Sequence, residues 1–581
     1  MTGLNRSSER HMLQCRQDTT THSRYHVEMT CLQSTEKAPL LTLGAIVVLS
    51  LLFLLTLCTK VEGALTTYPT PPNAVKSSVF TLMIDGTEVP VMKFMDYHYA
   101  HFSYSGSVAA TVRAMDRVSS HTIRPLSLGI RGEESGRDLT FSMIQTDGEQ
   151  ATPRYLVVQI DDLEKLVLLG DSPESDVPPS SGDGIFNVVD QFGADPSGAT
   201  YTQPAIQDAI DAASSFGSQS KQGVVYVPPG IYQVRADLVV KDNVDFYLAP
   251  GAVLKADDDI RNYDIEGSGT IGPVLTINGG SNVTIRGRGE VDASGIALMD
   301  LLGQTPPVFL TQAKAHPRRR IIQSSDEEPS KNVRIEGIIV KDATGWSVEL
   351  VRIDGVVVQH VKVLNHKNIQ WKIQNDGINA TSSSNVLINQ CFVMTIDDAM
   401  CAKASYESAG SMDNVLFANN VIWTWAAGVK AGMQNNHPMN GIVFRNIDIV
   451  HCRRAIGVDA KTSRDIGKEI SIGKVEFHDI RVDEIEGHWE VSKHDAVEFL
   501  LEDASAHDIE IRNLTLPRNR PIRCGPTYPA KGVTFHDLVM GGELITDVSQ
   551  VTLEGKQPIE GLTFNTVESD SDSPGERAPS Q

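Results

Sequence analysis

Short runs in which apolar and polar residues alternate recur along most of this chain, and each has the length of a β-strand. From about residue 280 onward, many of these runs share one form: a polar residue or glycine comes first, and a β-branched stretch follows. Runs of this form begin at Asn282, Asn332, Asn385, Asn414, Gly441, Lys474, Asp508 and Gly532. Successive starts lie mostly ~25–35 residues apart, which is a period typical of solenoid repeats. Because the units are strands, the pattern predicts an all-β fold: a parallel β-helix with three short strands in each coil.

The β-helix is expected to occupy residues 185–567. Near its start, residues 205–213 have helical periodicity, and Pro204 would lie in the first turn of that helix. Residues 223–232 follow as a strand, a turn and a second strand. We expect the helix to cap the open end of the sheet stack, as solenoids require. The acidic tail, residues 568–581, is predicted to be disordered.

The sequence before the β-helix has a different pattern. Residues 77–170 contain closely spaced strand-length runs separated by turn residues, which predicts a β-sandwich. This region has no cluster of acid, base and nucleophile, so we interpret it as an accessory or packing domain. The proline-rich residues 64–76 and the polar residues 171–184 are predicted to be linkers.

The N-terminus carries one apolar segment, Ala38–Cys58, which is 21 residues long and uncharged. One interpretation of residues 38–63 is the apolar segment and cleavage region of a signal peptide. That peptide would start at Met29 and would be cleaved before Ala64. The other is a signal anchor that leaves residues 1–37 as a polar tail in the cytosol. In both cases the bulk of the chain enters the secretory pathway. That part of the chain would then be extracellular, or held outside the cytosol by residues 38–58 alone.

Charge and cysteine content narrow the functional classes. A formal net charge of −22 argues against nucleic-acid binding, and it makes a strongly anionic substrate less natural. Four cysteines follow residue 60 without metal-ligand spacing, so a disulfide or buried thiols are expected. Three sequons, at Asn282, Asn379 and Asn513, are compatible with secretion.

Three aspartates are the candidate catalytic residues: Asp376, and 21 residues later the pair Asp397-Asp398. One short coil could place them on neighbouring coils, ~4.8 Å apart. Mutual repulsion should raise the pKa of at least one carboxyl group. Inverting glycoside hydrolysis needs such a division between a protonated acid and an ionised base. The same residues could also be structural turns. Calcium ligands are a third possibility, although the dense alternation of acids and glycines typical of repeat-type calcium sites is absent.

The segments Asn375-Asp376-Gly377-Ile378 and Ile396-Asp397-Asp398-Ala399 resemble those of pectin-lyase-like right-handed β-helix glycoside hydrolases. These include the polygalacturonase family (glycoside hydrolase family 28) and the dextranase and isopullulanase family (family 49). Over residues 185–480, the resemblance implies a polysaccharide hydrolase without metal or cofactor. Asp397 would be the general acid, Asp376 and Asp398 would hold and deprotonate water, and Asn375 would be a supporting amide. We expect a monomer.

Departures from the polygalacturonase pattern bear on the substrate. Residues 425–432 lack the histidine of the Gly-His-Gly motif, and residues 457–461 carry Asp459 where the arginine of the Arg-Ile-Lys motif is expected. Loss of a bidentate carboxylate ligand disfavours galacturonate. This reasoning predicts a dextran-type α-glucan. The alternatives are a polygalacturonase acting on a pectic polyuronide, a β-elimination lyase and a non-catalytic carbohydrate-binding β-helix.

Basic and aromatic residues near the aspartates are candidate substrate contacts. Lys403, Lys430 and Lys461 could replace the missing cations, but each could also be a solvated turn residue. Trp371, five residues before Asp376, is the preferred aromatic contact. The other tryptophans, Trp346, Trp423 and Trp425, could stack on sugar rings or pack between coils.

Overall fold

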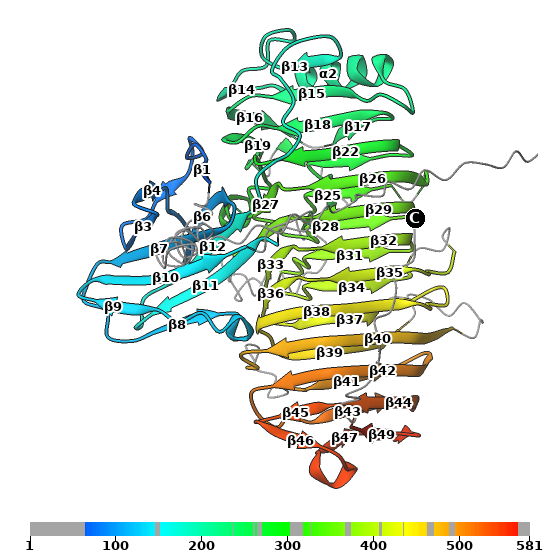
Figure 1. The fold of residues 1–581 in the computed structure, drawn as a ribbon. Coiled ribbons are helices and arrows are strands. Elements are labelled where there is room, and N and C mark those ends of the chain that lie inside the picture. Colours follow the sequence, from blue (N-terminus) through cyan, green and yellow to red (C-terminus); the bar gives the residue numbers. More distant parts are fainter. Residues whose placement is uncertain are drawn as a thin grey trace, which may run out of the picture. The chain divides into compact units, whose positions relative to one another are not determined.

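The computed structural model describes residues 64–566, except 146–151, 236, 260–261, 264–269, 302–317, 326, 367–372, 406–409, 434, 462–469 and 487–493. Most described residues belong to short strands, which form a two-sheet region followed by a long stack of coils (Figure 1). The predicted signal or anchor segment and the acidic tail lie outside the described residues. Among the residues that are described, no helix is both long enough and apolar enough to cross a membrane.

The N-terminal region is a β-sandwich, as predicted. One sheet contains β1 (Leu65–Thr67), β2 (Val75–Lys76), β5 (Met92–Phe94), β6 (Tyr97–Tyr104), β12 (Lys165–Asp171), β11 (Arg154–Ile160) and β8 (His121–Arg124). The other contains β4 (Thr87–Val89), β3 (Phe80–Ile84), β7 (Ser107–Ala114), β10 (Asp138–Ile144) and β9 (Glu133–Ser135). A short 3-10 helix, η1 (Leu126–Leu128), follows β8. Along β7, exposed and buried positions alternate because one face of that sheet covers the sandwich core.

Two boundaries differ from the sequence prediction. The proline-rich segment 64–76 is not only a linker, since β1 pairs with β6 and β2 pairs with β5. Asp171, predicted to begin the second linker, is the last residue of β12 and is fully buried. Its carboxylate contacts the ammonium group of Lys362 at 2.5 Å and the imidazole of His101 at 2.8 Å. These ionic partners explain why a charged residue can end a buried strand.

The β-helix begins at β13 and ends at β49, and its coils form three columns of strands that are parallel except where β46 pairs antiparallel with β45. The first column contains β13 (Ile185–Asn187), β15 (Gly223–Val227), β18 (Val244–Leu248), β22 (Ser281–Gly287), β26 (Ser330–Glu336), β29 (Ile353–Gln359), β32 (Ser384–Asn389), β35 (Val415–Ala418), β38 (Ile442–His451), β40 (Ser471–Val482), β42 (Ser505–Leu516), β44 (Ala530–His536), β48 (Ile559–Glu560) and β49 (Thr563–Asn565). The second column contains β14 (Ser197–Tyr201), β16 (Gly230–Val234), β19 (Ala252–Ala256), β23 (Glu290–Asp292), β27 (Ile339–Lys341), β30 (Lys362–Leu364), β33 (Phe392–Thr395) and β36 (Val421–Thr424), then the distal parts of β38, β40 and β42, and finally β45 (Leu538–Met540) with β46 (Glu543–Ile545).

The third column is an eleven-stranded sheet, and it carries the candidate site. Its strands are β17 (Leu238–Val240), β21 (Leu275–Ile277), β25 (Ile322–Ser324), β28 (Val348–Val351), β31 (Ile378–Thr381), β34 (Met400–Lys403), β37 (Ala427–Gly432), β39 (Arg454–Ala460), β41 (Val497–Leu501), β43 (Ile522–Pro526) and β47 (Leu553–Gly555). A separate pair, β20 (Thr270–Ile271) and β24 (Arg318–Arg319), lies outside the columns, as do α3 (Gly295–Leu301) and the 3-10 helix η4 (Val548–Gln550). The fold is therefore the predicted right-handed parallel β-helix.

Inward-facing side chains of the three columns form one continuous apolar core. Identical rings stack from coil to coil within it: the ring centroids of Phe417 and Phe444 are 4.6 Å apart, and those of Phe444 and Phe477 are 5.1 Å apart. These distances match the spacing of parallel strands. At the first coil, α2 (Gln203–Phe216) buries Ile206 and other apolar residues against this core. The helix thus caps the stack, as predicted (Figure 1).

The repeated polar residue that marks each run in the sequence has a conformational role. All eight of those positions, from Asn282 to Gly532, are in the left-handed region, with φ between 52° and 65°. Asparagine and glycine tolerate this region better than other residues do. Asn414 donates to Asn385 on the preceding coil at 2.7 Å, which continues the turn as a side-chain ladder. Gly355, with φ 82°, occupies the equivalent position near the start of β29, so the wide gap between Asn332 and Asn385 contains one more coil.

The cysteine alternatives are resolved for the described residues: Cys391, Cys401, Cys452 and Cys524 are all buried free thiols. One sequon is not available for modification in the folded chain, because Asn379 is fully buried and its amide donates to Asp376 at 3.1 Å.

Candidate active site

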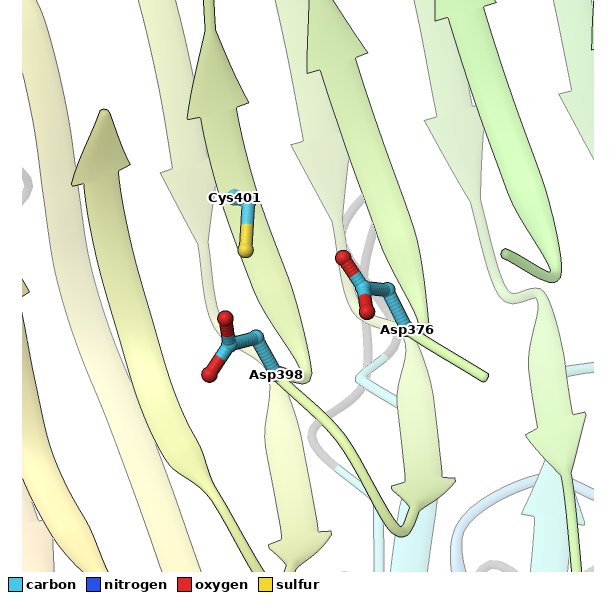
Figure 2. Close-up of side chains that lie close together, drawn as sticks. All are labelled: Asp376, Asp398 and Cys401. Atoms are coloured by element: carbon cyan, nitrogen blue, oxygen red, sulfur yellow. The ribbon is translucent and has the colours of Figure 1, made fainter. Parts of the chain in front are cut away.

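Asp376 and Asp398 occupy the same position on neighbouring coils, in the turn that leads from the second column into the third. Each aspartate precedes the first residue of its strand by two positions, and the register pairs Ile378 of β31 with Met400 of β34. The Gly377 amide donates to the Asp398 carbonyl at 3.0 Å, which joins the two turns directly. One carboxylate oxygen of each aspartate lies within 4.8 Å of the other (Figure 2). The fold therefore brings together the acids that the sequence separates by about twenty residues.

Gly377 allows the two turns to approach this closely. A Cβ atom at this position would lie 2.3 Å from the carbonyl oxygen of Ala399 and 2.3 Å from a methyl carbon of Val393. No rotamer change could relieve the clash with the backbone oxygen. The glycine of the Asn-Asp-Gly segment is thus a packing requirement of the site.

Asp376 is buried and paired with a buried cation. Its Oδ2 accepts hydrogen bonds from Lys403 Nζ at 2.5 Å and Asn379 Nδ2 at 3.1 Å. Burial raises the pKa of Asp376; Lys403 opposes this shift, and the neighbouring Asp398 adds to it. Within the described part of the chain, no hydrogen bond to Oδ1 is found, so this oxygen is the one available to a water molecule or substrate.

Asp398 is the most strongly stabilised anion of the three. Its Oδ2 accepts from Lys430 Nζ at 2.5 Å, its Oδ1 accepts from the Ala427 amide at 3.0 Å, and an Arg454 nitrogen lies 3.7 Å away. Although burial alone would raise the pKa of Asp398, Lys430 and Arg454 outweigh it and hold the pKa well below its usual range. Asp398 therefore stays ionised at any physiological pH.

Asp397 behaves in the opposite way. Burial, followed by the charges of Asp376 and Asp398, raises its pKa to about 7. Its side chain is nevertheless the most exposed of the three, since Asp376 and Asp398 are buried and Asp397 is only partly so. A carboxyl group that keeps its proton near neutrality and reaches solvent can act as a general acid.

The backbone around Asp397 is held by polar groups of three coils. The amide oxygen of Asn375 accepts from the backbone amide of Ile396 at 3.0 Å. The Asp397 carbonyl accepts from the hydroxyls of Thr395 at 2.5 Å and Thr424 at 2.6 Å. The buried Nδ2 of Asn375 has no hydrogen-bond partner among the described residues. Asn375 thus supports the turn with its oxygen and leaves a donor free.

Lys403 and Lys430 are both about 1% exposed, so the alternative that they are solvated turn residues is wrong. They face outward from adjacent strands of the third column, and each neutralises one aspartate. Lys403 Nζ also lies 3.6 Å from the ring centroid of Trp346, on the coil before Asp376. Lys403 is therefore enclosed between a carboxylate and an indole face, a favourable arrangement for a desolvated ammonium group.

Asp459 does not place an uncompensated negative charge in the site. Its carboxylate lies 3.0 Å from Lys430 Nζ and 3.3 Å from Arg454, and Arg454 also pairs with Glu498. A guanidinium group is nevertheless present five residues earlier in the same coil, where Arg454 lies beside Asp398. Spacing along the sequence could not show this, because it is the stacking of coils that brings Arg454 to the aspartates.

The remaining predicted contacts are not assembled at the site. Lys461 is 48% exposed and pairs with Glu502 at 2.8 Å, and it has no contact with the aspartates among the described residues. Trp371 lies outside the described residues. Trp423 and Trp425 are buried in an apolar cluster with Tyr97 and Tyr99 of the sandwich, so the packing alternative is correct for both. Trp346, which was not the preferred aromatic contact, lies against Lys403, the cation that pairs with Asp376.

Cys401 is a further potential metal ligand beside Asp376 and Asp398, and Figure 2 shows its thiol next to their carboxylates. The donor set suits a metal ion poorly. Lys403 and Lys430 already occupy one oxygen of each carboxylate. Burial also raises the pKa of the Cys401 thiol well above its usual value, which disfavours the thiolate that a metal requires. The residues present favour acid–base chemistry instead.

The fold is that of a pectin-lyase-like right-handed β-helix, and its third column carries a group of three neighbouring carboxyl groups. Residues 259–424 match the family model described as glycosyl hydrolases family 28, a range that contains all three aspartates. Residues 185–287 match the model described as rhamnogalacturonase A/epimerase, pectate lyase-like. The resemblance to family 28 found in the sequence is thereby confirmed.

Individual relatives are distant. The chain is 24% identical over 237 residues to a "Probable polygalacturonase" of Vitis vinifera, which covers 39% of this chain and 45% of that protein. It thus spans about half the length of that curated relative. Among solved structures, the polygalacturonase of Erwinia carotovora has a TM-score of 0.49 at 14% identity, over 68% of this chain and 98% of that one. The exopolygalacturonase of Thermotoga maritima has a TM-score of 0.44 at 15% identity, over 64% and 94%.

Proposed function

We propose that this protein is an inverting glycoside hydrolase that cleaves an α-linked pectic polyuronide. The observation that carries the proposal is the grouping of three aspartates on two neighbouring coils, where Asp376 pairs with Lys403 and Asp398 pairs with Lys430. In this arrangement the pKa of Asp397 is raised to about 7, whereas the pKa of Asp398 is held well below its usual range. Inverting hydrolysis requires one protonated and one ionised carboxyl group on opposite sides of the scissile bond.

In the proposed reaction, Asp397 donates its proton to the glycosidic oxygen as the bond from that oxygen to the anomeric carbon breaks. A water molecule forms the new bond to the anomeric carbon from the opposite face and gives a proton to Asp376. Asp376 is the better base because its pKa is raised and its Oδ1 is available, whereas Asp398 is a weaker base held by Lys430. Asp398 orients the water and helps to keep Asp397 protonated.

The substrate assignment reverses the dextran-type preference drawn from the sequence. That preference finds no support in the family matches, and the polygalacturonase alternative agrees better with them. Its physical basis is also weaker than the sequence suggested, because Lys430 and Arg454 compensate Asp459 and a guanidinium group is present beside Asp398.

We further infer that the reaction takes place outside the cytosol, on the basis of the apolar segment Ala38–Cys58. A polymer substrate agrees with this location. The monomeric state remains a prediction.

The test is to incubate the purified full chain with polygalacturonate, dextran and pullulan, with and without a chelator, and to measure new reducing ends. We expect release from polygalacturonate that the chelator does not change, and an inverted anomeric configuration in the first product observed by proton NMR. Release from dextran alone would restore the glucan assignment. Ultraviolet absorbance from an unsaturated product would indicate a lyase, and no product from any polymer would favour a carbohydrate-binding protein.

Two substitutions locate the activity. Asp397→Asn removes the proposed acid and should abolish hydrolysis of polygalacturonate. Asp162→Asn is the matched control, because Asp162 is an exposed aspartate of the sandwich region. Full activity of Asp397→Asn would show that the acid is elsewhere.

A further inference from the structure

A group of acidic, histidine and arginine side chains lies on the outer face of the first column, on β40, β42 and β44. The register pairs Glu476 with Glu510, and it places His478, Arg512 and His536 in the adjoining row on three consecutive coils. All five alternate with buried apolar positions, so their side chains point away from the core. None of them has a role in the proposed hydrolysis.

Donor atoms converge at this position. One carboxylate oxygen of Glu476, one of Glu510 and one ring nitrogen of His478 all lie within 4.8 Å of one another. His478 Nε2 is 3.2 Å from a Glu476 oxygen. With zinc–ligand bonds of 2.0–2.1 Å, the edges of a coordination tetrahedron are about 3.3 Å. The three donor atoms are therefore close enough together for one small divalent ion to reach all of them after small side-chain movements.

The histidine of this cluster has an unsatisfied nitrogen. His478 Nε2 is inaccessible to solvent and has no partner with hydrogen-bond geometry among the described residues, despite the nearby carboxylate. A buried polar atom without a partner is costly unless a ligand completes it. Coordination of a cation by the lone pair of Nε2 would remove that cost.

We propose that Glu476, His478 and Glu510 form a binding site for a divalent transition-metal ion of the zinc class. Two carboxylates balance the charge of the ion, and one imidazole selects a transition metal over calcium or magnesium. His536 Nε2 lies 3.1 Å from the Glu510 carboxylate and orients it from the following coil. Partners of this outer kind hold the coordinating groups in place.

Arg512 is the principal competitor for the ion. Its guanidinium group pairs with Glu510 between the two histidines, and its side chain is 40% exposed. Arg445 occupies the same row one coil earlier and adds a second exposed cation. Metal binding therefore requires the long side chain of Arg512 to turn outward, and removal of Arg512 should strengthen binding.

The test is zinc binding by the metal-free full chain, measured by isothermal titration and by the thermal shift on adding ZnCl2, with CaCl2 in parallel. We expect stoichiometric zinc binding that raises the melting temperature and no comparable effect of calcium. His478→Gln should weaken zinc binding at least about 10-fold, and His536→Gln by about 10- to 100-fold. Arg512→Ala should strengthen it. His507→Gln is the matched control, because His507 is another exposed histidine of β42 beside an acid, Asp508.

The proposal is overturned if zinc binds His478→Gln as tightly as it binds the unmodified chain, since the ion would then occupy other histidines. It is also overturned if calcium produces the same shift as zinc, because the imidazole would then have no part in selection. Polygalacturonate hydrolysis is measured separately, so failure of this site leaves the assignment of Asp397 unaffected.

Discussion

Substitution of Asp397 by asparagine should make the protein inactive and, above neutral pH, more stable. The asparagine keeps the shape of the side chain but cannot donate an acidic proton, so hydrolysis should fall by about 10²–10⁴-fold, the usual contribution of a general acid. Stability should change because ionised Asp397 is an unfavourable charge in the fold. Burial and the charges of Asp376 and Asp398 all act against its ionised form.

The sign and size of this effect follow from the pKa. In the folded protein the pKa of Asp397 is about 7, compared with 3.8 for an unperturbed carboxyl group. Between these values the folded state retains a proton that the unfolded state has lost, so stability falls as pH rises and levels off above about 7. At about 1.4 kcal/mol per pKa unit, the ionisation of Asp397 lowers the free energy of unfolding by at most roughly 4 kcal/mol. Because the side chain is partly exposed, we expect about 1–3 kcal/mol.

Urea unfolding of both proteins at about pH 4 and about pH 8 measures this difference. Asp397→Asn and the unmodified chain should have equal free energies of unfolding at the acidic pH, and the variant should be more stable at the alkaline pH. Asp162→Asn should match the unmodified chain at both. A variant that is less stable at the alkaline pH would refute the reasoning, since the Asp397 carboxylate would then be a favourable charge in the fold.

Other predictions follow from the packing of the site. Activity of the unmodified protein should decline as pH rises through about 7, measured as initial rate against pH. Lys403→Met should abolish hydrolysis and cost about 3–5 kcal/mol in urea unfolding at neutral pH, because Asp376 loses its buried partner; the exposed Lys461→Met is the control and should cost under ~1 kcal/mol. Trp346→Leu should lower stability by up to about 2 kcal/mol through loss of the Lys403 contact, whereas Trp346→Phe should retain most of it. Gly377→Ala should cost at least about 1–3 kcal/mol and reduce activity, measured by the same assays.

Much of the fold follows from local patterns, and the structure explains why. The polar residue that starts each run adopts a left-handed turn, so the same local requirement recurs on every coil and is visible as a repeat. The coil that begins at Gly355 escaped the pattern because glycine satisfies the turn without the asparagine signature. The boundaries of the sandwich were harder to predict, since Asp171 is polar yet buried by partners such as Lys362 that are distant in the sequence.

The candidate site could also be predicted only in part from the sequence. Asp376, Asp397 and Asp398 could be selected from the sequence because their spacing matches one coil and their flanking residues resemble a known family. The roles of Lys430 and Arg454 could not, because burial of a lysine and its pairing with Asp398 depend on what stacks above and below it. The dextran preference rested on the position of Asp459 along the chain, which could not reveal that Arg454 lies 3.3 Å from its carboxylate.

The sequence by itself determined the repeat that marks the β-helix, the closely spaced strands of the sandwich, and the three candidate aspartates. These features could be predicted because strand alternation and left-handed turns are requirements of a few adjacent residues. The tertiary structure decided which aspartate holds a proton. That choice depends on electrostatic energies over a few ångströms between coils. Asp398 pairs with Lys430 beside Arg454, and Asp376 pairs with Lys403, whereas at Asp397 burial and the two neighbouring carboxylates outweigh the attraction of the lysines. Three chemically identical residues thus acquire different properties from neighbours that the linear order does not reveal.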